Sequence, residues 1–180
     1  MTTGAHVTIT HKWGSVSDEE LCTRFAEAGA EPPMIVCADA GHAGDTAELM
    51  EQIASVQDGV DVFVSNVAFA QLPRSLDDYS RRGLKTSVDY SVWPLIEHLR
   101  AIRETFGRYP RYVVAMSSFG AIDYHTNYDF AAATKAMTES LCRYLSERLQ
   151  PHGVRVNVVR TRYVETDSLI STVGDGFGDF

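Results

Sequence analysis

Short apolar runs alternate with amphipathic segments along most of the chain, and this alternation constrains the fold more than any other feature. The apolar runs have the length of β-strands and occupy residues 4–10, 34–38, 60–64, 112–116 and 154–159. Helical periodicity lies between them, at residues 17–28, 45–55, 85–106 and 131–150. Strands that are apolar throughout are typical of a parallel sheet whose two faces are covered by helices. The sequence therefore predicts an α/β fold with a doubly wound parallel sheet.

Residues that cap or interrupt helices mark several boundaries. Ser17 precedes three acidic residues, and it is predicted to cap the helix at 17–28. Pro94 lies inside the helical segment 85–106, where we expect a kink. Residues 76–83 are expected to form a further short helix behind Pro73.

Composition narrows the class of protein. A length of 180 residues fits one domain, residues 1–180, with a substantial core. The net charge of −8 argues against a nucleic-acid partner, because binding phosphates needs a clustered positive field. No apolar run approaches the roughly 20 residues of a membrane span, and the N-terminus does not resemble a signal peptide. Three scattered cysteines indicate reduced thiols in a cytoplasm, and the six histidines show no metal-ligand spacing, so no metal site is expected.

The stretch from Asn127 to Lys135 carries the candidate chemistry. Tyr128 and Lys135 are seven residues apart, which is nearly two helical turns, so both side chains are predicted to share one helix face. Ala131 lies on the same face between them and leaves room for a flat ligand. A buried Lys near a Tyr lowers the pKa of the phenol and makes it a usable proton donor. The alternative is an ordinary surface Tyr and Lys on an alanine-rich helix.

These residues resemble the short-chain dehydrogenase/reductase superfamily, and the resemblance covers nearly the whole chain. Ordinary members have a Ser, a Tyr thirteen residues later, and a Lys four residues beyond the Tyr. Counted from Ser118, the Tyr position holds Ala131, whereas the Lys position holds Lys135. The divergent branch that contains the enoyl-acyl-carrier-protein reductases places its Tyr seven residues before the Lys, and Tyr128 with Lys135 is similar to that pattern. The resemblance implies a Rossmann-like fold.

The resemblance also implies a reaction. Tyr128 would protonate or polarise the enolate oxygen of a substrate, and Lys135 would hold the nicotinamide ribose and tune the pKa of the Tyr. The second Tyr of the enoyl reductases, ten residues before the first, is Ser118 here, whose hydroxyl has a different reach. Tyr128, Lys135 and Ser118 are thus the implied catalytic residues of an NAD(P)H-dependent reductase. Its substrate would be an enoyl or keto thioester or a related intermediate, either a small molecule or carrier-bound.

Residues that would meet the cofactor follow from the same resemblance. Asp39 would meet the adenine edge, and the loop after the strand at 60–64 would lie beneath the nicotinamide, where it contains Asn66, Val67 and Ala68. Thr166 matches the Thr that contacts the carboxamide or the phosphates, and Lys135 contacts the ribose. The implied cofactor is NADPH or NADH. Lys12 favours NADPH if it pairs with a 2′-phosphate, and a solvated loop lysine is the alternative.

The chain also departs from the superfamily. Members begin with a strand and a Gly-rich turn that holds the pyrophosphate, and no such motif occurs here. The last strand is also missing, so the chain resembles a reductase shortened at both ends. In the strand order 3-2-1-4-5-6, the absent first strand would separate the strands at 4–10 and 60–64. Three arrangements close this gap: those two strands pair directly and NAD(P)H affinity is negligible, another chain lends a strand, or the polypeptide is longer.

Two further expectations concern function and association. The alternative to a reductase is a degenerate or repurposed scaffold without redox activity, acting as a partner subunit or a small-molecule-binding protein. In the superfamily, the two long helices pack against their copies, which implies a homodimer or homotetramer here. The helices at 85–106 and 131–150 carry apolar stripes that would either form this interface or face the monomer's own sheet. The stripes contain Leu95, Leu99, Ile102, Met137, Leu141 and Leu145.

Overall fold

The computed structural model describes residues 4–13, 16–162 and 164, and it divides into two compact units. The first unit spans Met1–Gly59 and the second Val60–Phe180. Each unit combines helices with a parallel sheet, as the alternating sequence pattern predicts. Within the described residues, no helix is long and apolar enough to cross a membrane.

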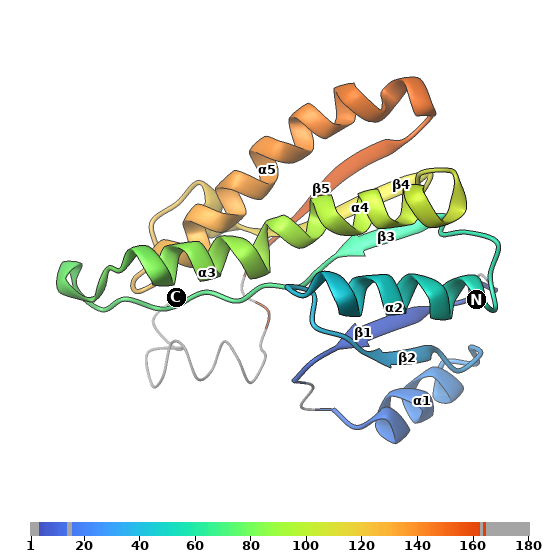
Figure 1. Cartoon of the computed structure of the whole chain (residues 1–180). Helices are drawn as coiled ribbons and strands as arrows, with labels where there is room; N and C mark the ends of the chain where they lie inside the picture. The colour runs from blue at the N-terminus through green and yellow to red at the C-terminus, as the bar shows by residue number, and fades with distance from the viewer. Residues whose placement is uncertain (1–3, 14–15, 163, 165–180) are drawn as a thin grey trace. The chain divides into compact units, whose positions relative to one another are not determined.

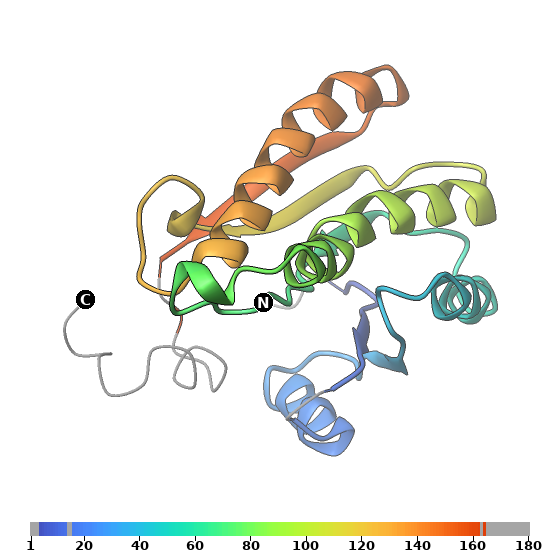
Figure 2. The same ribbon diagram turned by 60° about the vertical axis from the view of Figure 1, so that its left-hand side comes forward.

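The first unit holds a parallel pair of strands. β1 (Thr8–His11) pairs with β2 (Met34–Cys37), with Thr8 opposite Met34. The helices are α1 (Asp18–Glu27) and α2 (Ala43–Ala54), and the strands lie between them (Figures 1 and 2). Ser17 caps α1 as predicted, because its hydroxyl accepts a hydrogen bond from the backbone N–H of Glu20. The buried apolar side chains come from β2, the loop after it, and α2: Val36, Ala38, Leu49, Met50 and Ile53.

The second unit is built on a sheet of three parallel strands in the order β3-β4-β5. These are β3 (Val62–Ser65), β4 (Tyr112–Ser118) and β5 (Arg155–Thr161). The helices α4 (Trp93–Phe106) and α5 (Asp129–Leu149) cover one face of this sheet (Figure 2). β4 is the central strand and alternates half-buried with fully buried residues, because every second side chain points into the helix-covered core. The core cluster consists of Leu95, Leu99, Val113, Ala115, Cys142, Leu149 and Val154.

The predicted kinked helix at 85–106 is in fact two helices. α3 (Arg81–Ser91) ends before Val92, and α4 (Trp93–Phe106) begins immediately after it. Pro94 occupies the first turn of α4, where its missing N–H leaves no helical hydrogen bond unmade, so it starts a helix instead of kinking one. The segment 76–83, predicted to be one short helix, contains the 3₁₀ turn η1 (Leu76–Asp78) and then the first three residues of α3.

The long helix α5 (Asp129–Leu149) follows the 3₁₀ turn η2 (Phe119–Ala121) and leads into a second turn, η3 (Gln150–His152). α5 packs on β4 and β5 and also against α3. The position and length of α5 agree closely with the prediction from residues 131–150.

The two sheets share no hydrogen-bonded strand among the described residues. β1 is paired with β2, and β3 is paired with β4.

Candidate functional site

The candidate site is at the carboxyl end of β4. Ser117 and Ser118 end this strand, and η2 then leads the chain into a turn that returns to the start of α5. In parallel α/β sheets, the carboxyl ends of the strands are where ligands bind, because the loops that follow the strands converge there. The hydroxyl of Ser118 and the phenol of Tyr128 lie at this end of the sheet.

Tyr128 is the residue immediately before α5. Its backbone carbonyl accepts a hydrogen bond from the N–H of Ala132 at 2.6 Å, so the residue is the helix N-cap. The prediction that Tyr128 lies within the helix is therefore wrong by one residue. Asn127, with φ of 57°, supplies the left-handed turn that leads into this cap, a conformation that Asn tolerates better than most residues.

The structure brings Ser118 and Tyr128 together. The hydroxyl of Ser118 donates a hydrogen bond to the phenolic oxygen of Tyr128 at 3.3 Å. Both side chains are half-buried, so a ligand at this end of the sheet can reach them. With Ser118 as the donor, the phenolic proton of Tyr128 is available to another acceptor.

A glycine makes room for the ring of Tyr128. Gly120 is buried, and a Cβ at that position would lie 2.5 Å from Cδ1 and 2.6 Å from Cε1 of the Tyr128 ring. The ring of His125 meets the same ring edge-on, with centroids 6.2 Å apart. The ring is thus fixed by backbone on one side and by an aromatic edge on another.

Lys135 is held by the strand that carries Ser118. Its ammonium donates a hydrogen bond to the backbone carbonyl of Met116 at 2.9 Å. Burial lowers the pKa of Lys135, because the charged form loses solvation. The hydrogen bond anchors this part of α5 to the end of β4, so the ammonium lies at the same end of the sheet as the two hydroxyls.

A partly buried ionic cluster, made by Glu139, Ser117 and Arg160, ties α5 to two strands. Glu139 lies one turn beyond Lys135 and accepts hydrogen bonds from Ser117 at 2.6 Å and from Nε and Nη2 of Arg160 at 2.9 and 2.6 Å. The bonds from Arg160, and next those from Ser117, outweigh burial and lower the pKa of Glu139. The cluster joins α5 to β4 and β5. It therefore helps to fix the positions of Tyr128 and Lys135 relative to the sheet.

Sequence reasoning missed Gly120 and Glu139. A charged residue four positions after Lys135 was the available signal for Glu139, because a helix returns to nearly the same face after four residues. Gly120 carried no signal, since its role depends on where the ring of Tyr128 lies after folding.

The cofactor residues implied by the resemblance are only partly accounted for. Asp39, in the first unit, follows β2 and organises its own loop: it pairs with Lys12 and accepts a hydrogen bond from the N–H of Gly41 at 2.9 Å. The loop residues Asn66, Val67 and Ala68 follow β3 and are exposed. Thr166 lies outside the described residues. Among the described residues, no group of three His, Cys, Asp or Glu side chains is arranged to hold a metal ion.

The sequence matches a known protein family over nearly its whole length. The model of the enoyl-(acyl carrier protein) reductase family matches residues 1–178. The chain belongs to this family. Members of the family with curated functions are distant relatives. The 1-cyclohexenylcarbonyl-CoA reductase of Streptomyces collinus is 26% identical over 169 residues, which are 92% of this chain and 58% of the relative. The NADH-dependent enoyl-[acyl-carrier-protein] reductase of Aquifex aeolicus is 27% identical over 158 residues, 86% of this chain and 58% of the relative.

Solved structures show that the fold is the α/β, Rossmann-like fold of these reductases. The enoyl-[acyl-carrier-protein] reductase (NADH) of Aquifex aeolicus superposes with a TM-score of 0.78 at 24% identity, over 91% of this chain and 65% of that one. A short-chain dehydrogenase of Burkholderia cenocepacia in complex with NADP has a TM-score of 0.77 at 22% identity, over 91% and 66%. The family member described here spans 58% of the length of the two curated relatives named above.

Proposed function

We propose that this chain is an NAD(P)H-dependent reductase that acts on an enoyl or keto thioester, with Tyr128 as its proton donor. The observation that carries the proposal is the 3.3 Å hydrogen bond between the hydroxyls of Ser118 and Tyr128, at the strand end where Lys135 is anchored. Membership of the enoyl-(acyl carrier protein) reductase family supports the reaction class. The names of the two relatives, which act on CoA-linked and carrier-linked substrates, support a thioester.

The proposed role of Tyr128 is to give a proton to the substrate oxygen. A bound reduced nicotinamide would supply the hydride for the β-carbon of the enoyl group, which would leave the electron pair of the double bond on the thioester oxygen as an enolate. Tyr128 transfers its phenolic proton to that oxygen, and Ser118 stabilises the phenolate that remains by donating its own hydrogen bond. Lys135 stabilises the same negative charge electrostatically.

The donor set fits the nicotinamide end of the cofactor. The hydroxyls of Ser118 and Tyr128 and the half-buried ammonium of Lys135 are the groups that a ribose and a polarised carbonyl can hydrogen-bond. The resemblance assigns Asn66, Val67 and Ala68 to the nicotinamide, Asp39 to the adenine edge and Thr166 to the carboxamide or phosphates; we keep these assignments as part of the proposal. The Lys12–Asp39 pair means that a 2′-phosphate would have to compete with Asp39 for Lys12.

We also propose the wider setting of the enzyme. The two units are proposed to form one Rossmann-like domain, because a single family model runs through both. A reducing, cytoplasmic location is supported by three cysteines that form no disulfide, of which Cys142 is buried and Cys37 exposed.

The test is a cofactor titration followed by a turnover assay of the 180-residue chain. Fluorescence titration with NADH and with NADPH measures binding, and loss of nicotinamide absorbance in the presence of short trans-2-enoyl and 3-keto thioesters measures reduction. The proposal predicts binding of at least one cofactor and turnover of one thioester class. Binding of neither cofactor, with no turnover, would contradict it and favour the alternative of a scaffold without redox activity.

A further inference from the structure

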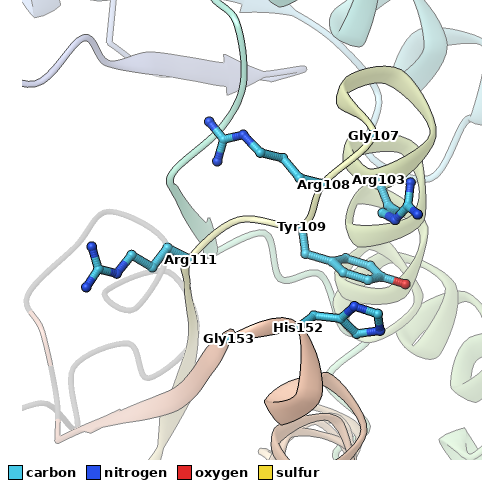
Figure 3. Close-up of a pocket in the computed structure, with 7 residues that line it drawn as sticks. All are labelled: Arg103, Gly107, Arg108, Tyr109, Arg111, His152 and Gly153. Atoms are coloured by element: carbon cyan, nitrogen blue, oxygen red, sulfur yellow. The ribbon is translucent and has the colours of Figure 1, made fainter.

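A separate hollow lies at the amino end of the second unit's sheet, opposite the end that carries Ser118. Its volume is about 360 Å³, and the end of α4, the start of β4 and the turn before β5 line it. Since β4 rises about 3.3 Å per residue from Tyr112 to Ser118, roughly 20 Å separate the hollow from the candidate active site. The lining side chains with charges or rings are Arg103, Arg108, Tyr109, Arg111 and His152 (Figure 3).

Two of the three arginines in the hollow have an aromatic ring as their neighbour. The guanidinium of Arg103 lies over the ring of Tyr109, 5.9 Å from its centroid, and that of Arg111 lies over Tyr112 at 5.4 Å. Neither guanidinium is within reach of a carboxylate in the part of the chain that the structure describes. The chain has 24 acidic residues against 16 Lys and Arg, so this is a positive region on an acidic protein.

Neighbouring groups reduce this positive charge without cancelling it. Arg108 pairs with the exposed Asp61 at 3.1 Å. The carboxyl end of α4, at Gly107, adds a partial negative charge that arginines commonly balance. The partial negative charge at the end of α4 explains the presence of Arg103 and Arg108, which flank that terminus. It does not explain Arg111, which precedes β4, or the imidazole of His152, whose ring centroid lies 5.2 Å from that of Tyr109.

We propose that this hollow binds a small molecule that carries two or more phosphate groups. The guanidiniums of Arg108 and Arg111 point to one side of the hollow, whereas Arg103 and His152 gather with Tyr109 on the other (Figure 3). Positive groups spaced in this way match an elongated anion with charge at both ends better than a single compact one. Guanidinium groups suit phosphate because they bind its oxygens with paired hydrogen bonds.

Isothermal titration of the full chain with inorganic tripolyphosphate, pyrophosphate and phosphate tests this site. We expect affinity to rise with the number of phosphates and to fall as salt is added. The double variant Arg103→Gln/Arg111→Gln should bind tripolyphosphate about tenfold more weakly, or worse, because two partners are lost. The matched control is Arg81→Gln/Arg82→Gln, which removes the same charge from exposed positions of α3 and should bind like the wild type. A titration with ATP separates a nucleotide from inorganic polyphosphate as the source of the phosphates.

Three results would overturn the proposal. The first is no tripolyphosphate binding by the wild-type chain at low salt. The second is an equal loss in both double variants, which would mean that only net charge matters. The third is an unchanged affinity in Arg103→Gln/Arg111→Gln. Thermal unfolding of each variant shows whether the chain is folded, and Arg111→Lys keeps the charge if Gln proves disruptive.

Discussion

At the scale of single residues, the absence of a side chain at position 120 decides where the ring of Tyr128 can lie. Gly120→Ala would put a methyl group 2.5 Å from Cδ1 of that ring, with Cδ2 of the His125 ring also 3.4 Å from the same methyl group. We expect the ring to be displaced, the hydrogen bond from Ser118 to be lost, reductase turnover to fall at least tenfold, and stability to drop by about 1–3 kcal/mol.

Turnover and thermal unfolding of the Gly120→Ala variant check this expectation. Gly44→Ala is the matched control, because its added methyl group would meet only the end of the exposed His42 side chain, at 2.9 Å. Wild-type turnover in Gly120→Ala would show that the ring does not need its present position.

Glu139 gives a prediction that depends on pH. The glutamate pKa is lowered in the folded state by Arg160, and the stabilisation that this represents is present above the pKa of the unfolded state and lost as pH falls through the folded value. Glu139→Gln removes the charge, so we expect a loss of about 1–3 kcal/mol near neutral pH.

The stability gap between wild type and Glu139→Gln should narrow below about pH 4.5, the ordinary value for glutamate. Urea unfolding of both proteins across that range measures it. A gap that stays constant down to pH 2 would mean that the ionic cluster is not what Glu139 contributes. Thr138→Ser, the conservative change of a buried neighbour without charge, controls for packing.

At the scale of elements, the loop after β3 is fastened to the start of α5. Tyr79 donates a hydrogen bond to Asp129, which raises the pKa of Tyr79, and its ring meets Phe130 edge-on at 5.0 Å. Ser91 holds the same loop farther back, through two hydrogen bonds with the backbone of Phe69 at 2.9 and 2.7 Å. These contacts place the residues proposed to lie beneath the nicotinamide on a fastened loop.

We predict that Tyr79→Phe loosens this loop without unfolding the protein. The ring contact with Phe130 is kept, and only the hydrogen bond to Asp129 is removed. Hydrogen exchange should speed up for amides between residues 69 and 79 and stay unchanged in β4. Equal protection of the loop in both proteins would show that the ring contact alone holds it.

Most elements could be predicted from the sequence because periodicity and capping are local. Ser17 caps its helix, and the pairing of Tyr128 with Lys135 rests on their spacing, whereas Ser118 was implied only by the resemblance to the enoyl reductases. The kink predicted at Pro94 was wrong, because Pro94 lies in the first turn of a helix and not in its interior. The sequence does not distinguish these two cases unless the start of the helix is known. Contacts such as that of Gly120 with Tyr128 join separate elements and could not be predicted.

At the scale of the whole molecule, the apolar stripes need to be divided between core and interface. Leu95, Leu99 and Ile102 are 0%, 3% and 2% exposed, so of the two alternatives left open by the sequence, the stripe on α4 faces the monomer's own sheet. On α5, Met137 and Tyr144 are 43% and 67% exposed and lie seven residues apart on one face. We therefore assign the proposed dimer interface to this face of α5.

A dimer or tetramer is expected by light scattering at micromolar concentration, and Tyr144→Asp is expected to shift it to the monomer mass. Desolvating a carboxylate inside an interface costs more than the lost ring contact. Tyr124→Asp makes the same change at a residue that is 86% exposed in the turn before α5, and it should leave the mass unchanged. A wild-type monomer would contradict the assignment.

In the proposed reaction, Tyr128 donates the proton to the substrate, and Ser118 supports it through their hydrogen bond. The most direct measurement is single-turnover reduction of the best thioester by the wild type, Tyr128→Phe and Ser118→Ala. We predict that Tyr128→Phe slows the reaction by ~10²–10⁴ with the fold intact, and that Ser118→Ala has a smaller effect. An active Tyr128→Phe variant beside an inactive Ser118→Ala variant would contradict this account of the site.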